Sequence, residues 1–267
     1  MFLALLFILP IVAVCQQWNY GYTISNLFWI SPVLYFSRAL VNQRLIGKGL
    51  RTLLLLPMTG FLLDILFAGR FFIFPNKAST VGISIHGYSF ESHSFDEPIP
   101  IEEFIFYIAG FAYTLYSYIY FTKILPFSPL RVSSWLRFPS QLQRIGALLC
   151  LLIGSSLLRW SLRGTLGIPE YLWFIILFGI GPVIWTSNKV SGKIHLGAFL
   201  LTLCSVLVIS ITWEVTLAIP QGWWGYKSDP MIGLFIDPWS HLPVESVLVW
   251  FCVSFTTVFT HEYLNLE

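Results

Sequence analysis

Residues 194–215 read IHLGAFLLTLCSVLVISITWEV. This stretch is almost wholly apolar, and Glu214, close to the end, is its only aspartate, glutamate, lysine or arginine. A helix that crosses a bilayer needs about 20 consecutive apolar residues. The stretch therefore predicts a transmembrane helix with a carboxyl group near one boundary of the membrane.

Similar apolar stretches recur along the chain. They cover residues 24–36, 52–67, 101–121, 145–160, 171–185 and 243–259. The N-terminal run, residues 1–15, is also apolar, and it lacks the basic start and the clear small-residue cleavage site of a signal peptide. We interpret it as an extra span; the alternative is a segment that lies on the membrane or is removed. The sequence thus predicts an all-α polytopic membrane helical bundle of 7–8 transmembrane helices.

The composition agrees with a membrane protein. Of 267 residues, 56% are hydrophobic and only 10% are charged, and the mean hydropathy is +0.75. Soluble domains carry about 25% charged residues, so a soluble globular protein is excluded. A net charge of +2 provides no basic surface for nucleic acid. The cysteines are far apart and form no CxxC pair, which argues against a disulfide scaffold or a thiolate metal site. They are Cys15, Cys150, Cys204 and Cys252.

Basic residues predict the orientation of the spans. Ten of the 15 lysines and arginines fall in residues 38–51, 123–144 and 186–193. Loops rich in lysine and arginine stay in the cytoplasm, and two spans separate each of these segments from the next. We therefore expect a multi-pass integral membrane protein whose acidic cluster lies at the non-cytoplasmic side.

Three short patterns occur twice, in the same order. The pairs are SPVLY at 31–35 with GPVIW at 181–185, Leu63-Asp64 with Trp213-Glu214, and PIEE at 100–103 with PVES at 243–246. An odd number of spans between two copies leaves both facing the same way. We therefore predict two parallel three-helix repeats joined by a linker helix. The expected segments are an N-terminal apolar segment at 1–19, a first repeat at 20–122, a linker with one span at 123–169 and a second repeat at 170–267.

The repeats bring acidic residues to one depth, near the membrane boundary. Ionisable residues inside spans are costly and usually functional. Burial and a neighbouring carboxylate both raise the pKa of a carboxyl group, and a protonated acid beside an ionised one can perform general acid–base catalysis. The alternative is that these acids complement the positive ends of helices and face interfacial water. The candidate catalytic residues are Asp64, Glu102, Glu103, Glu214 and Glu245.

Aromatic residues accompany the acids. Tyr107 and Phe111 follow Glu103 at spacings of four residues, on one helical face. Aromatic faces stabilise cations, so rings near a proton donor could bind a substrate that becomes cationic. The alternative is the aromatic belt of a membrane interface. The candidate substrate-binding residues are Tyr107, Phe111, Trp213, Trp223, Trp224 and Tyr226.

Other chemistry has little support in the sequence. His86, His93 and Asp96 could in principle hold a metal, but the spacing of the two histidines matches no known ligand pattern. Motifs for nucleotides or flavins are absent from the sequence. We therefore predict no metal and no cofactor.

Several of these motifs together resemble a known family, the lycopene cyclase domain. This domain occurs in heterodimeric or fused membrane-integral carotenoid cyclases of bacteria and archaea and at the N-terminus of bifunctional fungal enzymes. The second half matches through Trp213-Glu214, the GWWGY loop at 222–226, Gly233, LPVE at 242–245 and VFTHEYLN at 258–265. The first half matches through Asp64, Gly82 and PIEEF at 100–104.

The chain departs from the family pattern in several places. Ser246 replaces a second glutamate, and Glu214 stands where the family often has aspartate. Residues 71–75 lack the tryptophan loop, and residues between Gly82 and Pro98 look inserted. These departures concern the substrate more than the type of reaction.

The resemblance implies a redox-neutral cyclisation, an isomerase or intramolecular lyase reaction. A carboxylic acid protonates the terminal double bond of a lycopene-type polyene, the next double bond closes a ring on the cation, and a carboxylate removes a proton. We expect Glu102 and Glu103 to handle the protons, with Asp64, Glu214 and Glu245 as partners. The partners implied are a hydrophobic polyene that enters from the bilayer and the lipid membrane itself. The oligomeric state stays open, a homo-oligomer included.

Two other readings compete with the cyclase. A carotenoid hydratase, or another membrane terpenoid cyclase, would generate the same cation and capture it with water or another alkene. A small-solute transporter would share the topology of three, one and three spans, but it would place polar side chains near the middle of the membrane. Here the ionisable residues gather at one boundary, so we favour the cyclase.

Overall fold

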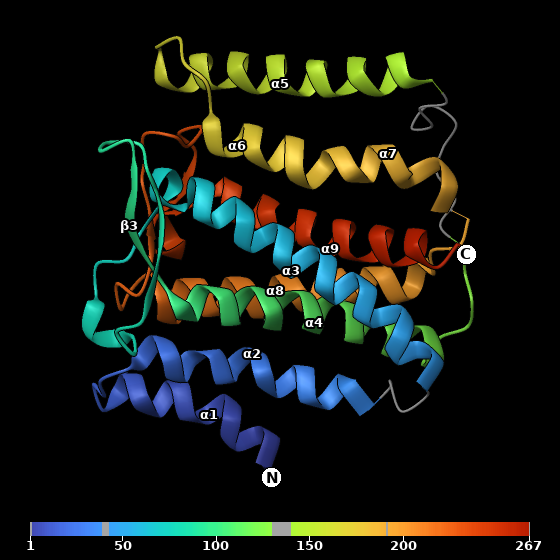
Figure 1. Cartoon of the computed structure of the whole chain (residues 1–267), viewed down its shortest axis with the longest axis horizontal. Helices are drawn as coiled ribbons and strands as arrows, with labels where there is room; N and C mark the ends of the chain where they lie inside the picture. Colours follow the sequence, from blue (N-terminus) through green and yellow to red (C-terminus); the bar gives the residue numbers. More distant parts are fainter. Residues whose placement is uncertain (1, 39–42, 130–139, 191, 267) are drawn as a thin grey trace. The chain divides into compact units, whose positions relative to one another are not determined.

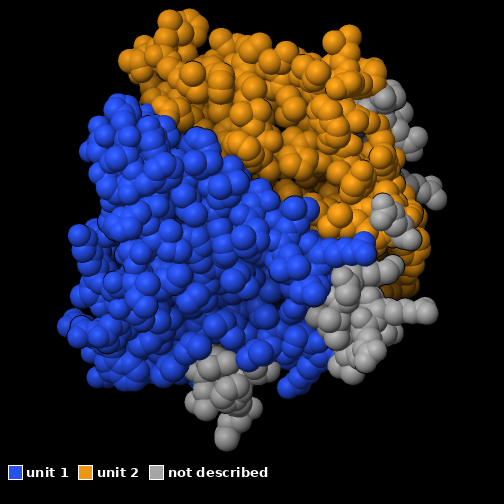
Figure 2. Space-filling model, in the orientation of Figure 1, with its two compact units in different colours: residues 1–117, 209–227 blue, residues 118–208, 228–267 orange. Residues whose placement is uncertain are grey.

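The computed structural model describes residues 2–38, 43–129, 140–190 and 192–266. Arg131 and Arg137, two of the basic residues used to predict the orientation, lie outside these ranges. The described chain is mostly helical, with short strands between helices (Figure 1). Figure 2 colours its two compact units, which are Met1–Ser117 with Ile209–Lys227 and Tyr118–Val208 with Ser228–Glu267.

The first unit contains helices and two short antiparallel strand pairs. Its elements are α1 (Phe2–Cys15), α2 (Gly21–Ser37), α3 (Gln43–Phe71), β1 (Phe72–Ile73), the short 3-10 turn η2 (Lys77–Ser79), β2 (Ser84–Ser89), β3 (Ser94–Pro100), most of α4 (Ile101–Ile124), the end of α8 (Leu196–Trp213), the π-helical η5 (Glu214–Ala218) and β4 (Gly225–Tyr226). Helix α1 packs along α2, and the β2–β3 hairpin packs against α3 (Figure 1). Strand β1 pairs with β4, so that Phe72 lies opposite Tyr226. The loop after α3 therefore lies beside the loop after η5.

Large aromatic side chains fill the core of this unit. The Trp29 ring meets Phe106 edge-on at 5.2 Å between centroids, and Phe106 stacks on Trp213 at 5.0 Å. Trp213 in turn contacts Trp224 at 5.8 Å. Such rings bury large areas and prefer offset or edge-on pairs, so this core is both extensive and geometrically specific.

The second unit is built around long helices. Its elements are α5 (Gln141–Arg163), α6 (Glu170–Phe174), the π-helical η4 (Ile175–Ile180), α7 (Gly181–Val190), most of α8, β5 (Phe235–Ile236), the short 3-10 turn η6 (Asp237–Trp239), β6 (Leu242–Pro243) and α9 (Val244–Leu264). Segments α6, η4 and α7 follow one another without a break, and η4 and α7 pack along α9. Side chains such as Phe199, Val258 and Phe259 form the apolar core beside them.

Local sequence accounts for the ends and the irregularity of these helices. Ser140 and Gln143 form a capping box at the start of α5, and Gly164 ends the helix in the left-handed conformation. In η4 the helix widens, and the Gly181 N–H bonds to the Ile176 carbonyl, five residues back. The widening comes just before Pro182, which has no N–H of its own and disturbs a regular helix.

Six helical segments in the described part of the chain are long and apolar enough to cross a membrane. They are Gly49–Phe71, Ile101–Ile124, Gln141–Arg163, Glu170–Val190, Leu196–Ala218 and Val244–Leu264. Helix α5 illustrates their outer surface, because Leu149, Ile153 and Leu157 are exposed along it. Contiguous exposed apolar side chains are unusual on a soluble monomer. The prediction of a mostly helical chain with several helices long and apolar enough to span a membrane is confirmed, and it is consistent with an integral membrane protein.

The two N-terminal helices are shorter. Helix α1 has 14 residues, which corresponds to about 21 Å at the helical rise, less than the roughly 30 Å of a bilayer core. Helix α2 has 17 residues, at the lower end of the range for a span. The predicted total of 7–8 spans is therefore not confirmed.

Candidate active site

Two of the predicted acids open helix α4. The chain leaves β3 at Pro100 and turns into the helix, which places Glu102 and Glu103 in its first turn. Both side chains are buried, with 0% of Glu102 exposed. Carboxylates at this end of a helix interact favourably with its dipole, yet complete burial removes the water that would otherwise solvate them.

The two oxygens of Glu102 differ in their surroundings. Oε1 accepts hydrogen bonds from Thr23 Oγ1 at 2.5 Å and from the Val81 N–H at 2.8 Å. Oε2 is buried and has no hydrogen-bond partner among the described residues. A buried oxygen of this kind is uncommon in native proteins. The arrangement fixes one oxygen and leaves the other available to a proton or a ligand.

Tyrosines hold two further acids in the same unit. The Tyr22 hydroxyl donates to Glu103 Oε1. The Tyr107 hydroxyl donates to Asp64 Oδ1 at 2.9 Å, from α4 to α3. The charges of Asp64, Glu102 and Glu214 all act on Glu103. These four carboxyl groups therefore form one cluster, which we call the acidic cluster.

Glu214 enters the acidic cluster from a distorted helix. It is the first residue of the π-helical segment η5 and is completely buried. The Tyr226 hydroxyl lies 3.5 Å from Glu214 Oε2, at the long limit of a hydrogen bond. π-Helical turns are rare in proteins as a whole, but those that occur are often found at functional sites. No feature of the sequence predicts the π-helical turn at Glu214.

The predicted aromatic residues also fall in the first unit. Phe111 lies 6.4 Å from Tyr107 along α4, and Trp213 precedes Glu214 directly. Trp224 stacks on Phe72 at 5.4 Å, next to the β1–β4 pair that contains Tyr226. Sequence reasoning missed further residues of this site, because nothing in their spacing marks them. They are Tyr22, Thr23, Trp29, Phe72, Val81 and Phe106.

Glu245 belongs to the second unit. It lies in the first turn of α9, is completely buried, and its Oε1 accepts a hydrogen bond from the Ile232 N–H. Its Oε2 has no hydrogen-bond partner in the part of the chain that the structure describes. The charges of Arg163 and Arg159 act on this carboxyl group.

The two arginines reach Glu245's surroundings from α5. Arg159 donates to the Met231 carbonyl and, at 2.9 Å, to the Asp229 carbonyl. Arg163 donates to the Ser228 carbonyl at 2.5 Å. Arg159 lies inside a predicted span, where an arginine usually has a specific partner. Its presence there could have indicated this site from the sequence.

Glu102 and Glu245 are held in the same way. In the first unit the Val81 N–H donates to Glu102, and the Ile83 carbonyl accepts from the first N–H of α4, at Ile101. In the second unit the Ile232 N–H donates to Glu245, and the Leu234 carbonyl accepts from the first N–H of α9, at Val244.

A glycine with positive φ lies between the two bonded residues in each case. The φ angles are +78° at Gly82 and +101° at Gly233, a region that other residues rarely adopt. The same three-residue device thus positions a buried glutamate at the start of a helix in both units.

The histidines considered as metal ligands lie in the β2–β3 hairpin. Asp96 accepts a hydrogen bond from Ser92 at 2.7 Å, and the hydroxyls of Ser92 and Ser94 hold the pKa of Asp96 below its ordinary value. His93 lies 3.5 Å from the Tyr88 hydroxyl. Among the described residues, no three His, Cys, Asp or Glu side chains are placed to hold a metal ion.

Comparisons of the chain with protein-family models, with curated proteins and with solved structures found no match.

Proposed function

We propose that the protein is a membrane-integral cyclase that closes a ring at an end of a linear polyene. The observation that carries this proposal is the environment of Glu102. Its Oε1 accepts two hydrogen bonds, whereas its buried Oε2 has no partner in the described chain. A carboxyl group held in this way has one oxygen free to carry a proton and to present it to a substrate.

The neighbouring acids supply the complementary base. Burying an ionised carboxylate away from water is costly unless it is paired, so four buried carboxyl groups whose charges act on Glu103 or belong to it favour sharing protons. We assign Glu102 as the acid and Glu103, held by the Tyr22 hydroxyl, as the base. Asp64 and Glu214 are the partners that complete the acidic cluster.

The proposed reaction needs no change of oxidation state. The proton on Glu102 Oε2 adds to the terminal double bond of the polyene and leaves a tertiary cation. The next double bond attacks this cation, which forms the new carbon–carbon bond of a six-membered ring and moves the charge into it. Glu103 then removes a proton from the adjacent carbon, and a ring double bond forms. The proton lost equals the proton gained, so no cofactor is consumed.

Aromatic rings near the acids support a cationic intermediate. Phe106, Trp213 and Trp224 contact one another at 5.0 to 5.8 Å between centroids. Cations over aromatic faces gain about 0.5 to 2 kcal/mol, the larger value where water is excluded. The resemblance to the lycopene cyclase domain supplies the substrate class, a hydrocarbon carotenoid that enters from the bilayer.

We also infer the finer architecture, with 7–8 spans and two parallel three-helix repeats. The matching loops at Gly82 and Gly233 support this arrangement. The spacing between a tyrosine near the start of each helix and the proline inside it also supports the repeat, because the two spacings are nearly equal. Tyr22 precedes Pro32 by ten residues, and Tyr171 precedes Pro182 by 11. The π-helical η4 between Tyr171 and Pro182 absorbs one extra residue. The basic loops then orient the acidic cluster away from the cytoplasm.

Expression in cells that accumulate lycopene tests this function. The expected result is a monocyclic or bicyclic carotenoid in the extracted pigments, lost in Glu102→Gln with protein still present in the membrane. Glu91→Gln, on the exposed turn between β2 and β3, is the control and should retain the product. Unchanged lycopene with folded wild-type protein in the membrane would refute lycopene as the substrate.

A further inference from the structure

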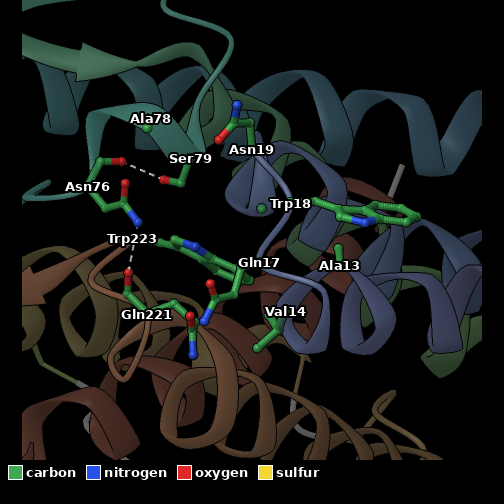
Figure 3. A pocket seen from close by; sticks show the side chains of 11 residues that line it. Ala13, Val14, Gln17, Trp18, Asn19, Asn76, Ala78, Ser79, Gln221 and Trp223 are labelled. Carbon is green, nitrogen blue, oxygen red and sulfur yellow. Dashed lines mark hydrogen bonds between the residues drawn. The ribbon is translucent and has the colours of Figure 1, made fainter.

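A polar pocket opens in the first unit, outside the acidic cluster. Its volume is about 220 Å³ (Figure 3). The amide side chains of Gln17, Asn19, Asn76 and Gln221 surround it, and all four residues lie at exposed loop positions (Figure 3). One water molecule takes up about 30 Å³, so the pocket has room for several.

Trp223 forms a wall of this pocket. Only 3% of its surface is exposed. A Cβ at Gly21 would lie 2.8 Å from Trp223 Cζ2, so the indole rests directly on the backbone at the start of α2. The backbone N–H of Trp223 donates a hydrogen bond to the Ala218 carbonyl at 2.9 Å.

The loop that carries Trp223 is fixed from the other side. The Asn76 N–H donates to the Gly222 carbonyl at 2.9 Å, and Asn76 Nδ2 donates to the Gln221 carbonyl at 3.1 Å, as Figure 3 shows for the side chain. Backbone and side-chain bonds thus hold the indole in one place.

The same indole adjoins the acidic cluster. Trp223 stacks on Tyr22, with 6.2 Å between ring centroids and 11° between ring planes. The Tyr22 hydroxyl donates to Glu103. Two stacked rings therefore separate a polar pocket with room for water from the buried carboxyl groups.

This position matters for a cation formed beside Glu102. If water reaches the cation, its oxygen bonds to the charged carbon and a carboxylate takes the released proton. The product is then an open-chain tertiary alcohol in place of a ring. A cyclase must exclude water from this step.

We propose that Trp223 is the residue that keeps pocket water from the cation and so selects ring closure over hydration. This inference rests on the proposed cyclase function. Trp223 acts by position and exchanges no proton, and Gly21 is part of the same device because a side chain there would displace the indole.

The test compares three variants of the full chain in membranes that contain lycopene and H₂¹⁸O. In Trp223→Ala, the ratio of alcohol to cyclic product should rise roughly tenfold or more, equal to about 1.4 kcal/mol between the two barriers, and the alcohol should carry ¹⁸O. Trp223→Phe should give a smaller rise. Trp18→Ala is the matched control, because Trp18 lines the same pocket but is 47% exposed; it should form cyclic product only.

A second measurement does not depend on turnover. Hydrogen–deuterium exchange of the backbone at the start of α2 and of α4 should become faster in Trp223→Ala and stay unchanged in Trp18→Ala. Cyclic product only from Trp223→Ala and Trp223→Phe would overturn the inference and leave the cyclase standing. A wild type without cyclic product would refute the cyclase instead, and unchanged exchange in Trp223→Ala would then refute the barrier as well.

Discussion

The Tyr22 hydroxyl donates a hydrogen bond to Glu103, a residue 81 positions further along the chain. The bond joins the first turn of α2 to the first turn of α4, and both side chains are buried. Through its ring Tyr22 also contacts Trp213 and Trp223. One side chain therefore connects the acidic cluster to the aromatic residues around it.

Replacing Tyr22 with phenylalanine should weaken both stability and activity. The change leaves a buried carboxyl oxygen without its donor, which costs about 1 to 3 kcal/mol. We expect a lower Tm in detergent and slower turnover. Tyr20→Phe is the control, because Tyr20 is exposed. Equal Tm and turnover in Tyr22→Phe and wild type would contradict a role for this bond.

Replacing Glu245 with glutamine should destabilise the fold less than replacing it with alanine. The amide oxygen of glutamine can still accept the Ile232 N–H, whereas alanine leaves that buried N–H without a partner. We expect Glu245→Ala to lose about 1 to 3 kcal/mol of unfolding free energy relative to Glu245→Gln. Thermal unfolding of the two proteins in the same detergent measures the difference, and identical Tm values would show that the bond does not hold the loop.

Replacing the glycine of each matching loop with alanine should lower the stability of the protein by different amounts. Alanine at Gly82 meets open space but must adopt a positive φ, a penalty of about 1 to 2 kcal/mol. Alanine at Gly233 adds a clash, because its Cβ would lie 2.6 Å from Arg163 Nε. Gly233→Ala should therefore lower the Tm more than Gly82→Ala. The reverse order would argue against the geometry of these loops.

Trp213 should matter through its aromatic face. Trp213→Phe keeps a ring beside Phe106, whereas Trp213→Leu removes it. If the ring stabilises a cation by up to about 2 kcal/mol, turnover should fall roughly tenfold or more in Trp213→Leu relative to Trp213→Phe. Turnover is divided by the amount of folded protein, and the folded fraction of each variant is taken from its own unfolding curve. Similar turnover in the two variants would contradict stabilisation of a cation by the Trp213 ring.

The sequence predicts the helices of this protein better than it predicts its site. Apolar stretches such as 52–67 and 101–121 lie inside helices of the structure because length and hydropathy decide a span. The sequence indicates the β2–β3 hairpin only as an insertion between Gly82 and Pro98, because the alternation of its side chains is short and polar.

Within the site, the sequence identifies the acids and misses most of the residues that hold them. Carboxyl groups in apolar stretches are conspicuous, so Asp64, Glu102, Glu103 and Glu214 could be chosen from the sequence, and they meet in one unit. Tyr22 could not, because a contact across 81 residues leaves no periodic trace. The parallel repeat and its boundaries remain predictions.

The most direct test of the central claim follows the proton itself. The full-length protein in lipid vesicles is equilibrated in D₂O and supplied with lycopene, and the products are analysed by mass spectrometry. If an exchangeable carboxylic acid starts the cyclisation, each new ring should carry one deuterium, and Glu102→Gln should lower the rate by about 10² to 10⁴. Cyclic product without deuterium, or full activity in Glu102→Gln, would contradict Glu102 as the acid that starts the reaction.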